Sequence, residues 1–154
     1  MKHASRLALA ALLTILARPV LAQSTIAGTW IADFEHHLRN ENGEVSSEKG
    51  KARILFEVRG DSVFGTWTVL SPAPAPGLTP RHLRGTFGGG RVRVVADPID
   101  ALVNVNGSVT AVSMITTYEF TVNGDSLTGT AEIKAVDGSL PGMSRPFSAA
   151  REKA

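Results

Sequence analysis

The chain contains few residues of the types that perform catalysis or bind metals. It has no cysteine and four histidines in 154 residues, which excludes thiolate nucleophiles, disulfides and cysteine-ligated metals. His36 and His37 follow Asp33 and Glu35, and imidazole and carboxylate groups together are able to bind zinc. However, adjacent residues of an extended chain point to opposite sides, and His82 stands alone. The pattern favours solvated loop histidines, and we predict neither a metal site nor a cofactor.

No other arrangement of side chains indicates an enzyme. A Gly-x-Ser-x-Gly motif, a phosphate-binding glycine loop, a pair of catalytic carboxylates and a Ser-His-Asp spacing are all missing from the sequence. We therefore expect no catalytic activity.

Two charged motifs have a chemical and a structural interpretation. Four arginines (Arg81, Arg84, Arg91 and Arg93) fall on one predicted hairpin, where they could bind an acidic headgroup. A solvated outer face paired with acidic residues of neighbouring strands is the favoured alternative. The tripeptide of residues 59–61, Arg-Gly-Asp, has the sequence of an adhesion motif, but a second copy of this stretch carries Asn-Gly-Asp instead and indicates a turn.

That duplicated stretch predicts the fold. Residues 56–69 read FEVRGDSVFGTWTV and residues 120–133 read FTVNGDSLTGTAEI. In each copy two alternating runs flank Gly-Asp, which is typical of a β-hairpin. A two-residue turn predicts that Val58 faces Val63, Phe56 faces Gly65 and Ile54 faces Trp67. In the second copy Phe120 faces Gly129. If Asn123-Gly124 instead forms a type I′ turn, the pairing partners shift but every residue keeps its face. An aromatic ring over a strand glycine makes the contacts that the glycine itself cannot make, and the glycine lets the barrel wall bend.

Alternation of apolar and polar residues predicts about eight strands, and eight antiparallel strands close a small up-and-down β-barrel. The strands fall at 26–35, 52–58, 63–69, 83–87, 92–96, 112–122, 127–133 and 147–151. Residues 36–50, 71–80, 99–108 and 137–144 are predicted loops, with 102–105 able to form a short extra strand. Connections after the second, fourth and sixth strands are tight and the others are long, so any binding mouth should lie at the loop-rich end.

The N-terminus resembles a secretory signal peptide over residues 1–22, with basic residues before an apolar run and Val20-Leu21-Ala22 at the cleavage position. Residues 23–154 then form one domain of 132 residues. Loss of Lys2, Arg6 and Arg18 leaves 13 basic and 14 acidic residues, which argues against nucleic acid as a partner. No other apolar run is long enough for a membrane span. An exported chain without cysteine fits a bacterial periplasm or exterior.

Gly28-Thr29-Trp30 on the first strand and Arg151 on the last resemble the calycin superfamily of lipocalins, fatty-acid-binding proteins and avidins. Those proteins share Gly-x-Trp on strand one and a basic residue on the final strand that packs across the tryptophan. The repeated Gly-Asp-x-Leu-x-Gly-Thr and the terminal Phe-x-Ala-x-Arg are also similar to small lipocalin-like domains of exported bacterial proteins. The resemblance implies structural roles for Gly28, Trp30 and Arg151. The lipocalin Thr-Asp-Tyr segment is missing, and the biotin-binding residues of avidins do not follow Trp30.

The inward stripe of the predicted barrel contains the candidate ligand-binding residues. These are Phe34, Phe56, Trp67, Phe87, Met114 and Tyr118. They could line a cavity for a small apolar or amphipathic ligand, or they could fill the core, because small barrels do either. The sequence thus predicts an exported ligand-binding barrel. The alternative is a protein-interaction or inhibitor module. In that case the barrel core is filled and rim loops such as 71–80 contact a protein partner, which the sequence does not identify.

Overall fold

The computed structural model describes residues 26–39, 45–71, 80–105 and 107–153, and within them every regular element is a β-strand. The all-β prediction is therefore confirmed. The predicted signal peptide lies outside the described residues, as does most of the proline-rich loop 71–80. No helix in the described ranges is long and apolar enough to cross a lipid bilayer. The strands are β1 (Gly28–Arg39), β2 (Val45–Arg59), β3 (Ser62–Ser71), β4 (Arg81–Gly88), β5 (Arg91–Ala96), β6 (Ile99–Val105), β7 (Ser108–Asn123), β8 (Ser126–Ala135) and β9 (Met143–Arg151).

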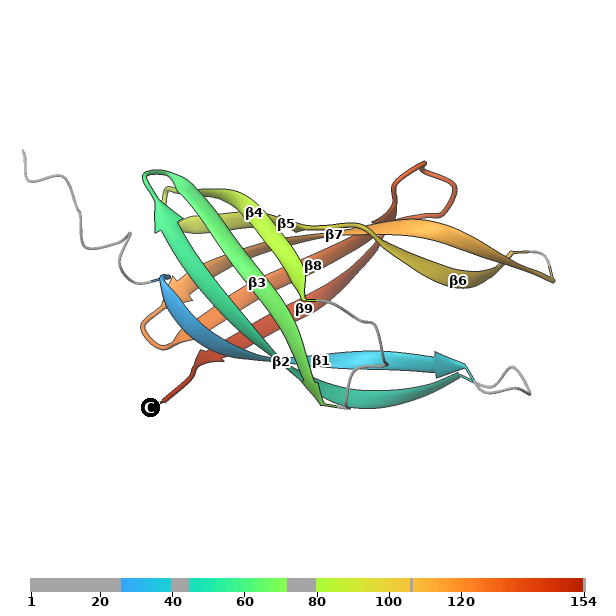
Figure 1. The fold of residues 1–154 in the computed structure, drawn as a ribbon, viewed down its shortest axis with the longest axis horizontal. Coiled ribbons are helices and arrows are strands. Elements are labelled where there is room, and N and C mark those ends of the chain that lie inside the picture. Colours follow the sequence, from blue (N-terminus) through green and yellow to red (C-terminus); the bar gives the residue numbers. More distant parts are fainter. Residues whose placement is uncertain (1–25, 40–44, 72–79, 106, 154) are drawn as a thin grey trace, which may run out of the picture.

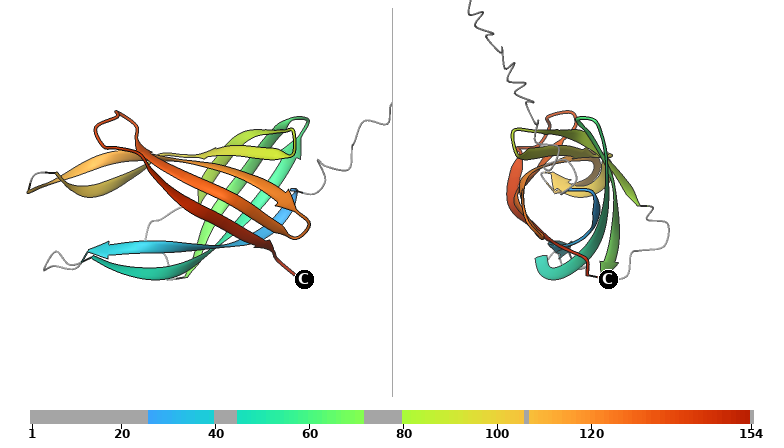
Figure 2. Two further views of the ribbon diagram at one scale, coloured as in Figure 1. Left: turned by 180° about the vertical axis from the view of Figure 1, so that it is seen from behind. Right: turned by 90° about the vertical axis from the view of Figure 1, so that its left-hand side faces the viewer.

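Eight of these strands close an antiparallel barrel (Figures 1 and 2). Hydrogen-bonded neighbours follow the order β5-β4-β3-β2-β1-β9-β8-β7, and β5 pairs with β7 to complete the circuit. Closure leaves no free edge on the barrel wall itself, because each wall strand has a neighbour on both sides. The predicted eight-stranded up-and-down barrel is confirmed.

The two copies of the repeated stretch form the predicted hairpins. Val58 pairs with Val63, Phe56 with Gly65 and Ile54 with Trp67, while Phe120 pairs with Gly129. Gly60 and Gly124 adopt φ of 61° and 60°, the left-handed region that a two-residue turn requires and glycine tolerates. Together with the turn between β4 and β5, these two turns lie at one end of the barrel, on the left in Figure 1.

The prediction of a long loop over residues 36–50 is wrong. β1 continues to Arg39 and β2 begins at Val45, and the pair keeps one register from Gly28↔Phe56 to Arg39↔Val45. β3 and β9 pair with β2 and β1 only as far as Lys51 and Asp33, so the rest projects as a two-stranded ribbon. Its polar sequence resembles a loop because outside the barrel neither face has a core to cover.

Residues 99–108 also differ from the predicted mixed loop. Ile99–Val105 forms β6, a longer strand than the suggested one, and it pairs with the start of β7. β7 is therefore shared: its first half pairs with β6 outside the barrel, and its second half pairs with β5 in the wall. The two ribbons, β1–β2 and β6–β7, project from the same loop-rich end, on the right in Figure 1.

A series of aromatic rings crosses the interior of the barrel. The ring centroids of Phe56, Phe120, Phe147, Tyr118, Trp67 and Phe34 are successively 5.8, 5.3, 5.2, 5.5 and 5.8 Å apart. Trp67 and Tyr118 are stacked, and the others meet edge-on or tilted. Offset and edge-to-face contacts are the favoured aromatic geometries. These contacts form one continuous aromatic cluster across the middle of the barrel.

Candidate functional site: the inner wall at the loop-rich end

The predicted ligand-binding residues divide between the two ends of the barrel. Phe56 and Phe87 lie toward the tight turns, where Phe56 is buried in the core and Phe87 packs against it. Trp67 and Tyr118 are buried at mid-height, with 8% and 7% of their surface exposed. Phe34 and Met114 lie farther along their strands toward the loop-rich end and are only half-buried. The structure therefore places two of the six toward that end and two at mid-height; whether they bind a ligand stays a prediction.

Half-buried side chains continue this inward register beyond the aromatic rings. We call them the inner wall: Phe34, Val69, Arg81, Met114, Ile133 and Arg145. Inward-facing residues nearer the tight turns, such as Val63 and Leu127, have no exposed surface. Solvent therefore reaches the inner wall, as it reaches the half-buried Val58 and Val122 beside the tight turns, and the fully buried interior lies between the two ends of the barrel.

Arg81 is the functional candidate that sequence analysis placed on the wrong face. We predicted it on the solvated outer surface with Arg84, Arg91 and Arg93. Arg81 pairs with Trp67 and lies two residues from Leu83, which is buried, so it has the inward register. Counting alternate residues back from Leu83 would have revealed this. Arg145 has the inward register for the same reason, because Phe147 is buried two residues later.

Hydrogen bonds hold the Arg81 guanidinium at the loop-rich end. Its Nη2 and Nε donate to the carbonyl oxygen of Asp97 over 2.7 and 3.2 Å. Burial lowers the pKa of Arg81, partly opposed by Tyr118 and Asp97, and burial raises the pKa of Tyr118, partly opposed by Arg81. Arg81 pairs with Trp67 in the sheet, and the Trp67 ring stacks on Tyr118 with 5.5 Å between the ring centres, so Arg81 and Tyr118 are both neighbours of Trp67. An arginine carries five N–H donors, so the two bonds to Asp97 leave donors for an acceptor such as a carboxylate.

The charged residues of inward register in β3, β4, β5, β7, β8 and β9 are all arginines. They are Arg81 and Arg145 near the loop-rich end and Arg151 near the tight turns, whereas Glu48 has the inward register in the projecting part of β2. Because a half-buried cation beside apolar side chains favours an anion over a neutral group, the inner wall suits the acidic end of an amphipathic molecule.

Gly28, Trp30 and Arg151 meet near the tight-turn end. The Arg151 guanidinium lies 4.2 Å from the ring centre of Trp30, and its Nη1 donates to the carbonyl oxygen of Ala27 over 3.0 Å. The buried indole donates from Nε1 to the carbonyl oxygen of Ile26 over 2.9 Å. Gly28 has φ of 119°, and a Cβ there would lie 3.0 Å from Arg151 Nη1. The three residues thus form one packing unit away from the inner wall.

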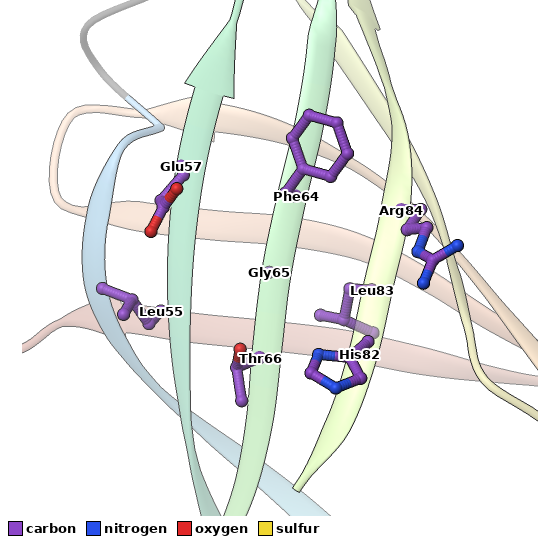
Figure 3. Close-up of a pocket in the computed structure, with 8 residues that line it drawn as sticks. All are labelled: Leu55, Glu57, Phe64, Gly65, Thr66, His82, Leu83 and Arg84. Carbon is purple, nitrogen blue, oxygen red and sulfur yellow. The ribbon is translucent and has the colours of Figure 1, made fainter.

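The outer surface holds the remaining candidates. His82 faces outward into a hollow of about 330 Å³ over β2, β3 and β4, beside Leu55, Phe64 and Arg84 (Figure 3). A second outer hollow, of about 520 Å³, lies over β4, β5, β7 and β8 and includes Arg91 and Arg93. In the described part of the chain, no three histidine or acidic side chains gather at metal-binding distance.

The other charged motifs are accounted for by their neighbours. Arg59 of the Arg-Gly-Asp turn pairs with Glu57 at 3.1 Å and lies over the ring of Phe64 at 5.3 Å. Arg93 pairs with Glu119 at 3.0 Å, as expected of a solvated outer face. The strand register pairs His36 with Glu48 and His37 with Ser47. The structure does not describe the side chains of the two histidines.

Comparisons with known proteins assign no family to the chain. No protein-family model and no curated protein matches the chain. Among solved structures, the monomer form of the M. tuberculosis PknI sensor domain is similar, with a TM-score of 0.48 and 13% identity over 82% of this chain and 86% of that chain. At this level the similarity assigns no family and no function.

Proposed function

We propose that the protein is an exported binding protein that holds a small amphipathic, acidic molecule against the inner wall of its loop-rich end. The observation that carries the proposal is the inward-facing Arg81, whose strand partner Trp67 stacks on Tyr118, on a wall whose apolar side chains are half-buried. The export signal predicted from residues 1–22 supports a role outside the cytoplasm. The Arg151–Trp30 contact supports a place among the calycins, a family whose barrels bind such ligands at their open end.

The apolar part of the ligand would contact Phe34, Val69 and Met114. Covering these half-buried side chains removes apolar surface from water, which contributes about 25 cal/mol for each Å². The stacked rings of Trp67 and Tyr118 form the floor of the proposed site. Trp67 contacts Phe34 and pairs with Arg81, so both of these inner-wall residues lie directly above the stacked rings. The ligand is therefore expected to enter no deeper than these two rings.

The acidic part would accept hydrogen bonds from Arg81. Bonds between a guanidinium and a carboxylate are about twice as strong as neutral ones, and a half-buried position limits screening by salt. This arrangement predicts that a carboxylate binds more tightly than the alcohol of the same chain length. We assign no reaction to the site.

A titration with paired ligands tests the proposal. Dodecanoate and dodecanol are added to the protein, and Trp67 fluorescence reports binding, because Trp30 is fully buried near the other end. We expect dodecanoate to bind about tenfold more tightly than dodecanol, and Arg81→Gln to abolish the difference. Arg84→Gln is the matched control, since Arg84 is on the same strand but faces outward.

Two results would contradict the proposal. One is the absence of binding by a panel of fatty acids and other amphipathic acids, together with no co-purified small molecule in native mass spectrometry. The other is an equal loss of affinity in both arginine variants, which would point to the outer surface.

A protein-interaction module is the second candidate. The filled aromatic interior favours it, as do the exposed Leu55 and Phe64 around the outer hollow, with 45% and 37% exposure. It predicts that the small-molecule titrations fail and that Leu55→Lys disrupts a protein complex.

A further inference from the structure

The β6–β7 ribbon leaves a strand edge uncovered. Within the described residues β6 pairs with β7 alone, through seven positions from Ile99↔Met114 to Val105↔Ser108. The ribbon projects beyond the barrel wall, since β8 pairs with β7 only from Met114 onward (Figure 1). An exposed edge presents unpaired N–H and C=O groups to another strand.

The side chains of this ribbon are unusually apolar for an exposed element. Leu102 and Val109 are 78% and 69% exposed, and Ile99 is 42% exposed. Asp100 is the only charged residue between positions 99 and 113. Edge strands are usually protected by lysine, proline or a bulge. β6 contains no lysine and no proline. An isolated two-stranded ribbon is only marginally stable in water, so a further strand would stabilise it.

The sequence of β6 is complementary to itself in one antiparallel register. With Leu102 at the centre, Leu102 faces the same residue of a second copy, and Ala101 faces Val103. In this register Asp100 faces Asn104, so the carboxylate meets an amide donor and not a second carboxylate. A shift by one position would place apolar side chains opposite polar ones.

We propose that β6 pairs with β6 of a second copy of this chain to form a two-fold symmetric dimer. The two ribbons then make a continuous four-stranded antiparallel sheet in the order β7-β6-β6-β7. Such an interface is isologous and closes on itself, so it forms dimers and not fibres. It contacts neither the inner wall nor Arg81.

The dimer should be weak and concentration-dependent. Strand pairing over seven residues a side covers less area than a standard interface, and we expect a dissociation constant on the order of micromolar. Sedimentation velocity of the purified mature protein over a dilution series would show a monomer–dimer equilibrium.

The central position gives the first test. Leu102→Lys places two ammonium groups face to face at the two-fold axis, and should weaken dimerisation about tenfold or more. Leu70→Lys is the matched control, because Leu70 is an exposed leucine of β3 at 40% exposure and its substitution should leave the dissociation constant unchanged. Circular dichroism confirms that each variant is folded.

A charge exchange tests the register itself. Asn104→Asp places carboxylates opposite each other, and should weaken the dimer, while its Oδ1 still accepts from the Gly107 amide, as Asn104 does over 2.8 Å. Adding Asp100→Lys should restore dimerisation, since lysine then faces aspartate. This test remains valid even if the Leu102→Lys variant fails to fold.

Three outcomes would overturn the inference. They are a wild-type protein that stays monomeric at all concentrations, a dimer equally sensitive to Leu70→Lys and Leu102→Lys, and a double variant that remains as weak as Asn104→Asp. Dimerisation that survives together with failed ligand titrations would refute the proposed function alone.

Discussion

Replacing Arg151 by glutamine should destabilise the barrel by about 3 kcal/mol. Arg151 is on the final strand and is held between the first strand and the β7–β8 turn. It lies over the fully buried ring of Trp30 at 4.2 Å, and donates to the Ala27 carbonyl oxygen over 3.0 Å and to Asp125 Oδ1 over 3.1 Å. Glutamine retains a donor but loses the charge and the planar face.

The magnitude follows from these contacts. A cation over a desolvated indole contributes about 1–2 kcal/mol, and a partly buried charged hydrogen bond to a carbonyl about 1.5 kcal/mol. The ion pair with Asp125, whose side chain is 74% exposed, adds about 0.5 kcal/mol at most. For about 130 residues the entropy of unfolding is roughly 0.27 kcal/mol/K, so the midpoint of thermal unfolding should fall by about 10 °C.

Thermal and urea unfolding of three variants separate the contributions. Arg151→Gln should show the full loss, Arg151→Lys about half of it because the charge remains without the planar face, and Asp125→Asn about 0.5 kcal/mol or less. The reasoning is refuted if Arg151→Gln costs no more than Asp125→Asn, since the stacking on Trp30 would then contribute nothing.

Two further predictions concern the wall and the interior. A Cβ on Gly129 would overlap the Glu119 carbonyl oxygen and lie 2.6 Å from the Phe120 Cα, whereas on Gly65 the nearest atom is the Phe56 ring at 2.9 Å. Gly129→Ala should therefore cost about 3 kcal/mol or more, and Gly65→Ala about half as much, because a ring yields more readily than backbone; equal urea midpoints would contradict this. Burial raises the pKa of Tyr118 above the ordinary 10.0, so the fold favours the neutral phenol. This stability is fully present below pH 10.0 and lost as pH rises through the folded pKa. The chain has one tyrosine, so tyrosinate absorbance reports it alone, and Tyr118→Phe should remove this part of the alkaline loss.

Much of the wall could be predicted because its information is local. Alternation assigns each residue to a face, and the two Gly-Asp turns set the register of their hairpins, so pairs such as Phe56–Gly65 follow from sequence separation alone. Closure into a barrel follows from the strand number, since eight antiparallel strands are enough to remove both edges.

The candidate site depended on tertiary structure. Whether inward aromatic residues enclose a cavity or fill it depends on how rings from β1, β2, β3, β7 and β9 meet across the interior, and alternation carries no information on that. The inward direction of Arg81 was available from its parity with Leu83, but its importance was not, because only the fold stacks its strand partner Trp67 on Tyr118.

The duplicated stretch and the two ribbons show the same division between local and long-range information. A turn and its flanking pairs involve neighbours in the chain, so the sequence alone determined them. The extension of β1–β2 and β6–β7 beyond the wall depends on where the adjacent strands β3, β8 and β9 stop pairing. That limit is set by residues far away in sequence. Only the tertiary structure therefore revealed that β6 has one neighbour among the described strands, and that the inner wall is accessible to solvent.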